Sequence, residues 1–402
     1  GLKFTGHVPF RQVCLHSLVR NADGQKMSKS KGTGIDPIDL NQRFGTDAMR
    51  FTLASMAAPG TDIVLSEERI EGNRNFANKI WNAARFVFMN LDKYEAAGGE
   101  PLEALASPEV RADAPYAAGT EAALIDRWIF ARLAETIINI NKALEHFRFH
   151  EAAHEVYHFF WGDFCDWYIE WVKPELLSQD RAGATAAWKN LFAVFESALR
   201  LLHPFMPFLT EELWHQLPQG VGARSIALDR FPKPPDSPID SAAKEQISLL
   251  QDIIVAARNI RAEMKLDMKA KLQPQLRVAS DSIRTYIEQN IEPIERLGNV
   301  MRPSFVASPF DSTKGVIRST KDFELFIAYG ASFDVEGELL RLRKELDRLT
   351  KDIASKQSRL ADETFRSRAP EHIVKGLEST LAERRTEFDK VGERLAQLER
   401  LS

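Results

Sequence analysis

The strongest constraint on the fold is an apolar repeat with the helical period, which continues from about residue 66 to residue 215. Apolar side chains recur three and four residues apart, first from Ile70 to Leu91 and then from Ile125 to Phe147. Such stripes must pack against other apolar faces, and the connections are short, so an antiparallel helix bundle is predicted. Its helices are expected near 66–91, 125–147, 151–172 and 183–202, with a short helix from Thr210 and a loop insertion at 96–120.

The end of the chain carries a heptad-like pattern. Leu339, Leu342 and Leu346 begin a series with alternating spacings of three and four, and a second series runs from Leu377 to Leu398. Two such helices joined by a short break predict an antiparallel coiled-coil hairpin over residues 335–402.

Between these two regions, proline and glycine mark a boundary. Residues 217–242 contain seven of them and are interpreted as a linker. Short runs at 273–279, 303–307 and 323–329 are expected to be strands. With helices at 243–263 and 282–297, they predict a small α/β module over 243–334. The fold class is therefore expected to be mainly α.

The first 62 residues predict a strand, a loop and two helices. Residues 10–20 are apolar and β-branched enough for a buried strand, and 21–24 form a turn signal. Asp36 and Pro37 suit the cap and first turn of a helix. Residues 45–47 then break the chain before a second helix.

Between the strand and the first helix lies the sequence KMSKS. Lys26 and Lys29 are three residues apart on a polar loop, so both ammonium groups can face one polyanion. Ser28 and Ser30 add hydroxyl donors. Such a loop can stabilise the charge that develops on a leaving pyrophosphate. A solvated basic loop is the alternative that these residues alone leave open.

Composition argues against several other classes of protein. No uninterrupted apolar run approaches the roughly 20 residues that span a bilayer, so no membrane segment is expected. Cys14 and Cys165 are too few for a disulfide scaffold or a four-thiolate zinc site, and both are expected to be buried in a protein of the reducing cytoplasm. The net charge of −4 hides a pattern, because residues 1–60 carry 8 basic and 4 acidic side chains whereas residues 61–250 carry 18 and 28.

Several stretches resemble the class I aminoacyl-tRNA synthetases. KMSKS at 26–30, with FGTDAMRF at 44–51, is similar to the second signature of that class. Residues 73–91 and 160–176 resemble its valine, isoleucine, leucine and methionine branch, and most closely the valyl-tRNA synthetase family. The resemblance covers nearly the whole chain, and a terminal coiled-coil hairpin is typical of the valyl family.

The resemblance implies a valine–tRNA ligase, which activates valine with ATP and transfers it to tRNA(Val). In the family, the second lysine of the motif contacts the ATP phosphates, and Lys29 matches it. Lys26 matches the first lysine, and both lysines are expected to be catalytic, with Ser28 and Ser30 also at the ATP site. Mg²⁺ is implied by ATP chemistry, and no zinc or other resident metal is expected. Thr33 stands where the family usually has Asn, so no amide role is expected there.

Two other parts of the family, the HIGH signature and the editing insertion, are not found in the chain. We interpret the chain as a C-terminal portion that is expected to be inactive by itself. The resemblance implies the end of a Rossmann-type catalytic domain at 1–62, an anticodon-binding helix bundle at 63–216, the linker at 217–242, the small α/β module at 243–334 and a coiled-coil tRNA-binding arm at 335–402.

Candidate tRNA contacts are basic side chains of the bundle and the arm. The residues selected are Arg74, Lys79, Arg341, Arg343, Arg366 and Arg368. Arg85, Arg127, Arg132 and the basic run at 258–271 are further candidates. For each of them, a salt-bridged surface cation is the alternative.

Other interpretations also stay open. An isoleucyl member of the branch is the nearest enzyme, and a non-catalytic tRNA-binding module is the alternative from another class. Asp47 and Arg50 either orient the lysine loop or serve as a helix cap and a surface cation. A cytoplasmic monomer is expected.

Overall fold

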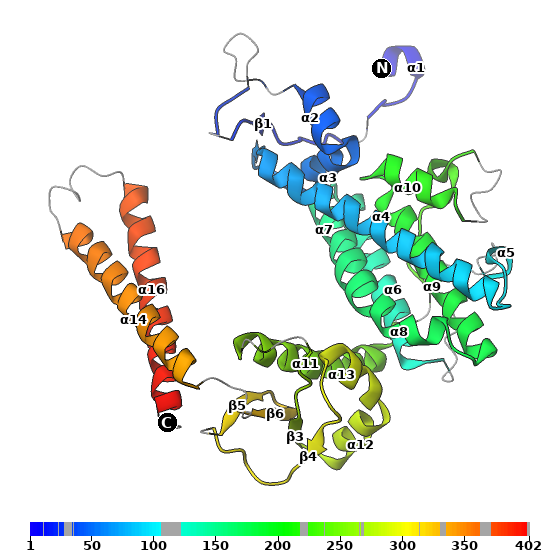
Figure 1. Cartoon of the computed structure of the whole chain (residues 1–402). Coiled ribbons are helices and arrows are strands. Elements are labelled where there is room, and N and C mark those ends of the chain that lie inside the picture. The colour runs from blue at the N-terminus through cyan, green and yellow to red at the C-terminus, as the bar shows by residue number, and fades with distance from the viewer. Residues whose placement is uncertain are drawn as a thin grey trace. The chain divides into compact units, whose positions relative to one another are not determined.

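The computed structural model describes the chain apart from several gaps (Figure 1). The residues outside the description are 11, 23, 28–33, 35, 106–121, 218–223, 237, 265, 267–268, 313, 330–334, 362–370 and 400–402. Contacts divide the chain into two compact units, Gly1–Ser248 and Leu249–Ser402. Among the described helices, none has both the length and the apolar character needed to cross a bilayer.

The first unit is built around a helix bundle, and its helices occur where the apolar period predicts them. They are α4 (Glu67–Ala96), α6 (Leu124–Glu145), α7 (Phe149–His158), α8 (Ile169–Leu176), α9 (Arg181–Leu202) and α10 (Pro207–Trp214). Every residue from Leu191 to Leu202 is buried, so the second half of α9 is surrounded by the rest of the unit. A short helix, α5 (Leu102–Leu105), lies in the predicted loop insertion.

The segment between α7 and α8 is a π-helix, Phe159–Tyr168, which the apolar period does not predict. The sequence predicts one α-helix over 151–172. A π-helix in its middle is not apparent from the sequence, because the segment remains rich in apolar residues. A π turn holds more residues than an α turn and changes the direction of the side chains that follow. Here Phe164 lies in the core, while Asp163 and Asp166 reach cations on neighbouring helices.

The N-terminal segment differs from its prediction. After α1 (Leu2–Thr5), the strand β1 comprises Val19–Arg20 and pairs in parallel with β2 (Ile63–Val64). Residues 12–18 are mostly exposed, Cys14 included, so the predicted buried strand at 10–20 and the predicted burial of Cys14 are wrong. A buried strand needs partners along its edges and cover on its faces, and β2 provides a partner for two residues. Cys165 is buried, as predicted.

The described part of residues 217–242 lies against the bundle. A 3-10 turn, Ile226–Leu228, buries Ile226, and the carbonyl of Arg230 accepts a hydrogen bond of 2.8 Å from Arg200. Arg200 is itself buried and pairs with Glu196 at 2.7 Å. Side chains of α9 therefore bind the backbone of this segment.

The second unit contains a four-stranded sheet in the order β4-β3-β6-β5. β3 (Pro274–Val278), β4 (Ser304–Phe305) and β6 (Phe323–Ala328) match the predicted strands, and β5 (Gly315–Ser319) is an additional one. The helix α11 (Ser241–Glu263) is as predicted, although it begins within the first unit. The expected helix at 282–297 is interrupted at Asn290 and forms α12 (Asp281–Gln289) and α13 (Ile291–Gly298).

The chain ends in α14 (Val335–Ala361) and α16 (Glu371–Glu399), which lie side by side (Figure 1). They are antiparallel, because Arg343 near the start of α14 pairs with Glu399 at the end of α16. Leu342 is buried in their apolar contact. Over the described residues, the chain therefore ends in two antiparallel helices, and the coiled-coil hairpin stays a prediction.

Candidate active-site loop and nucleic-acid interface

A hydrogen-bonded turn determines where the KMSKS stretch begins. The N–H of Asn21 donates to the carbonyl of Gln25 at 3.0 Å, and the N–H of Gln25 donates to Asn21 Oδ1 at 2.7 Å. Gly24 has a φ of +75°, a conformation that side-chain-bearing residues adopt at a cost. Lys26 then forms a bridge with Arg20 of β1. The turn therefore holds the first lysine beside the end of β1.

Lys26 and Met27 are the residues of the motif that the structure describes. Lys26 is exposed, and Met27 is partly buried against an apolar cluster, which we call the α2–α4 cluster. The buried members of this cluster are Leu40, Ala48, Met49, Leu65 and Ile70. Ser28, Lys29 and Ser30 lie outside the described residues, so their relation to Lys26 stays a prediction.

Two short helices follow the motif. α2 (Pro37–Phe44) begins as predicted, with the N–H of Ile38 donating to Asp36 Oδ1 at 2.9 Å. Gly45 has a φ of +92° and joins α2 to α3 (Thr46–Met56). The two helices therefore meet at a residue whose conformation favours glycine.

Asp47 caps a helix other than its own. It is 9% exposed, and its two carboxylate oxygens accept hydrogen bonds from the N–H groups of Phe208 (3.2 Å) and Leu209 (2.6 Å) at the start of α10. Burial raises the pKa of the Asp47 carboxyl, and these backbone donors oppose that rise. Arg50, one turn later, donates to the carbonyl of Pro204 at 3.0 Å. Asp47 therefore caps α10 and not α3, and Arg50 is bound to a backbone carbonyl and is not simply a solvated cation.

A pocket of about 410 Å³ lies next to α3. Its walls are mainly apolar, with Leu53, Phe149 and Phe205 among them. Two polar residues at its edge are engaged, since His16 Nδ1 contacts the carbonyl of Ser17 and the hydroxyl of Ser17 donates to a backbone carbonyl. The pocket therefore suits an apolar group better than a phosphate.

One face of α4 is exposed and carries cations, amides and a tryptophan. We call this face the α4 stripe, and it consists of Arg74, Asn78, Trp81, Asn82, Arg85 and Met89. At 3.6 residues per turn these positions share an arc of roughly 100°. Trp81 is 48% exposed, and neither Arg74 nor Arg85 forms an ion pair with another described residue. Glu71 precedes the first residue of the stripe and Asp92 follows its last residue, so both charged residues within the stripe are basic.

The other basic candidates of the bundle are ion-paired. Lys79 pairs with Asp166 at 2.7 Å and lies over the ring of Trp161. Arg127 pairs with Asp240 at 2.6 Å. These contacts favour a structural role over a role in binding RNA.

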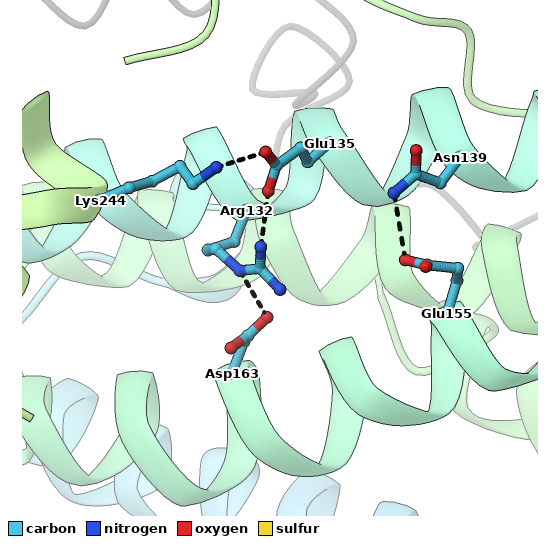
Figure 2. A network of polar contacts seen from close by, with 6 residues as sticks. All are labelled: Arg132, Glu135, Asn139, Glu155, Asp163 and Lys244. Atoms are coloured by element: carbon cyan, nitrogen blue, oxygen red, sulfur yellow. Dashed lines mark hydrogen bonds and ion pairs between the residues drawn. The ribbon is translucent and has the colours of Figure 1, made fainter. Parts of the chain in front are cut away.

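Arg132 belongs to a larger polar network that joins several helices. Figure 2 shows its guanidinium between Asp163 of the π-helix, at 2.9 Å, and Glu135 of α6, at 2.5 Å. Glu135 also pairs with Lys244 of α11. Burial raises the pKa of Asp163, and the charge of Arg132 opposes that rise. Arg132 thus compensates carboxylates within the bundle.

Cations of the second unit divide in a similar way. Arg261 is buried and donates to the carbonyls of Ala270 and Asn299, both at 2.6 Å, so this member of the basic run at 258–271 binds the backbone of its own unit. Arg341 and Arg343 pair with glutamates of the hairpin but keep exposed fractions of 40% and 61%. Arg366 and Arg368 lie outside the described residues.

Sequence comparisons identify three parts of this chain. The family model for class I tRNA synthetases (I, L, M and V) matches residues 1–66. The model for the anticodon-binding domain of tRNA ligase matches residues 126–276, and that for the valyl tRNA synthetase tRNA binding arm matches residues 334–399.

Similar proteins match along nearly the whole chain. The valine–tRNA ligase of Solibacter usitatus is 41% identical over 392 residues, which are 97% of this chain and 42% of that relative. The valine–tRNA ligases of Listeria innocua and Bacillus subtilis are 37% and 36% identical over 100% of this chain, which covers 42% and 43% of their lengths. This chain belongs to the valyl-tRNA synthetase family.

The matched segments show which part of the family each site residue belongs to. Lys26, Met27 and Asp47 lie in the segment matched by the class I synthetases, and the π-helix lies in the anticodon-binding segment. The α4 stripe lies between these two segments and is covered by the matches to valyl-tRNA synthetases that span the whole chain. Trp81 was not among the sequence candidates, because the apolar period of α4 does not reveal which tryptophan is exposed.

The chain spans about 42% of the length of the valyl-tRNA synthetase family members that it matches, and it corresponds to a C-terminal portion. Among solved structures, it matches a LeuRS chain from a ternary complex of Agrobacterium radiobacter K84 with tRNA and LeuAMS. That match has 21% identity and a TM-score of 0.38, and covers 55% of this chain and 24% of that chain. A likeness of this degree does not establish a shared fold.

Proposed function

We propose that this chain provides the lysine loop and the tRNA-binding parts of a valine–tRNA ligase. The reaction joins the valine carboxylate to the α-phosphate of ATP with release of pyrophosphate, and the valyl group then passes to tRNA(Val) with release of AMP. The observation that carries the proposal is 36–41% identity to valine–tRNA ligases along nearly the entire chain. The division at 1–62, 63–216, 217–242, 243–334 and 335–402 is part of the proposal.

In this proposal, Lys26 and Lys29 stabilise the negative charge of the ATP phosphates as pyrophosphate leaves. A fixed ammonium group close to a developing charge lowers the barrier without covalent catalysis. Ser28 and Ser30 would donate hydrogen bonds to the same phosphates. Mg²⁺ would arrive with the nucleotide, and among the described residues no group of three or more His, Cys, Asp or Glu side chains could hold a metal ion.

The experiment is a charge-removing substitution in the full-length ligase. Lys29→Gln removes the charge and keeps a polar side chain that is one atom shorter, so valine-dependent ATP–pyrophosphate exchange is expected to fall about 100-fold or more. Lys31→Gln is the matched control in the same loop and is expected to cost less than about fivefold. Equal losses in both variants would contradict a specific role for Lys29.

The amino acid is tested with the same enzyme. Valine is expected to support exchange and charging of tRNA(Val), whereas preferential charging with isoleucine would favour the isoleucyl alternative. For the 402-residue chain alone, we expect tRNA binding without exchange activity. Equal binding to any polyanion would contradict recognition of tRNA by this chain.

We also propose that the α4 stripe contacts tRNA. Arg74 and Arg85 supply charges for phosphates, and Trp81 supplies an exposed ring on which an unpaired base can stack. Lys79 is retained as a weaker candidate because of its ion pair. In the arm, Arg341, Arg343, Arg366 and Arg368 are the proposed contacts. The ligase is proposed to act as a monomer in the cytoplasm, as the valine–tRNA ligase assignment and the low cysteine content suggest.

A further inference from the structure

We propose that Asp47 is a positioning residue that couples the two flanks of the KMSKS stretch to the α9–α10 turn of the bundle. By flanks we mean Met27, the second residue of the motif, and α2, which follows the motif. The coupling is a property of the folded first unit. Its consequence for ATP rests on the function proposed above.

Hydrogen bonds join Asp47 to the start of α10. A helix start leaves backbone N–H groups without partners, and these groups attract negative charge. Asp47 belongs to α3, yet its carboxylate accepts from both Phe208 and Leu209. Because each oxygen serves one donor, the carboxylate fixes the direction of α3 as well as its distance from α10.

Other residues of α3 also contact the α9–α10 turn. Arg50 of α3 donates to the carbonyl of Pro204, between α9 and α10. On the same helix, the ring of Phe51 meets that of Phe205 edge-on, with centroids 6.2 Å apart. His203 interacts electrostatically with Asp47. The Nδ1 atom of His203 lies 2.7 Å from the hydroxyl of Thr210. The α9–α10 turn is therefore held to α3 by several contacts.

An apolar cluster connects α3 to both flanks of the motif. Ala48 and Met49 of α3 are buried in the α2–α4 cluster, together with Leu40 of α2. Met27 packs against the same cluster. A closely packed cluster transmits displacement, because side chains cannot shift independently. Movement of the α9–α10 turn would therefore displace both flanks of the motif.

Hydrogen exchange tests the coupling in the 402-residue chain. Asp47→Asn keeps the shape of the side chain but leaves one oxygen for two donors. Amide exchange is expected to rise about fivefold at the start of α10, which corresponds to the loss of one hydrogen bond. A rise is also expected in peptides that cover residues 20–27 and 37–44. A rise confined to α10, or no rise anywhere, would overturn the proposal.

Two further variants make the result decisive. Asp180→Asn is the matched control, because Asp180 caps the start of α9 through Ala182 at 3.2 Å, whereas the turn to α10 follows the end of α9. It should affect the start of α9 alone, and a rise at residues 20–27 or 37–44 would overturn the specific coupling. If Asp47→Asn unfolds the chain, Arg50→Gln decides, since it removes an exposed contact to the same turn. Arg50→Gln should raise exchange in both flanks, and unchanged flanks would overturn the proposal.

In the full-length ligase, Asp47→Asn is expected to raise KM for ATP about fivefold and to leave KM for valine within about twofold. Equal changes in both constants, or none, would overturn the consequence for ATP. If the ligase proposal itself is wrong, the unsubstituted enzyme will show no valine-dependent ATP–pyrophosphate exchange. The hydrogen-exchange experiment does not depend on that activity, so the two failures can be distinguished.

Discussion

At the scale of single residues, burial decides what the charged side chains of the bundle can do. Arg200 and Glu196 are almost fully buried and satisfy one another, and Arg132 compensates Asp163. By contrast, Arg74 and Arg85 are exposed on α4. The four arginines are the same residue type in the sequence, so their roles differ because of their surroundings.

Asp126 provides a prediction at this scale. It is 7% exposed and accepts a hydrogen bond of 2.7 Å from the hydroxyl of Tyr168. Burial raises its pKa, and the bonds from Tyr168 and Asn190 oppose the rise. The folded state therefore holds this proton more tightly than the unfolded chain, and the free energy of unfolding should fall as pH rises from about 4 through the raised pKa.

Asp126→Asn removes this titration while keeping an acceptor for Tyr168. Urea unfolding from pH 4 to pH 7.5 should show the variant gaining about 1 kcal/mol relative to the unsubstituted chain at the neutral end. Parallel pH curves for the two proteins would show that Asp126 does not titrate differently on folding.

At the scale of elements, the period of a helix indicates its buried side more reliably than the function of its exposed side. The helices of the bundle lie where the apolar repeat predicts them, yet the π-helix at Phe159–Tyr168 redirects Asp163 and Asp166. For α4, the repeat indicates the face with Phe76 and Ile80, and the opposite face carries the α4 stripe.

The α4 stripe predicts a salt effect on tRNA binding. Each phosphate contact contributes about 0.7–0.9 to the slope of log affinity against log salt. Arg74→Gln with Arg85→Gln should therefore weaken tRNA binding and lower that slope by about 1.5 in magnitude. Arg69→Gln is the control, because Arg69 is exposed on another face of the same helix. An unchanged slope in the double variant would exclude the stripe as a phosphate-binding surface.

At the scale of the whole molecule, the chain consists of two compact units, and α11 belongs to both. Its first turns include Lys244, which pairs with Glu135 in the first unit. Its last turn includes Arg261 and Glu263, which bind partners in the second unit. The boundary between units therefore falls inside a helix rather than in the segment rich in proline and glycine.

This arrangement predicts how fragments behave. A fragment of residues 239–402 keeps Asp240, whose carboxylate accepts from the N–H of Ala243 at 2.9 Å and caps α11. A fragment of residues 249–402 loses the cap and the first turns, so it should be less stable by about 1 kcal/mol or more. Thermal unfolding followed by circular dichroism measures the difference. Equal stability would show that the start of α11 contributes nothing to the second unit.

The sequence by itself determined where the α-helices of the bundle and the two terminal helices lie, and the family resemblance. Regular apolar spacing is a local property, and KMSKS with its flanks is a contiguous string, so both can be read from one chain. The predicted strand at 10–20 failed because burial of a strand depends on partners distant in sequence.

Only the tertiary structure decided which polar groups meet. Asp47 and Leu209 are 162 residues apart, and no local sequence pattern predicts that Asp47 caps the helix that contains Leu209. The same holds for Arg132 with Asp163 and for the exposure of Trp81. A charge acquires its role from its neighbours and its burial, and both are determined when the helices pack.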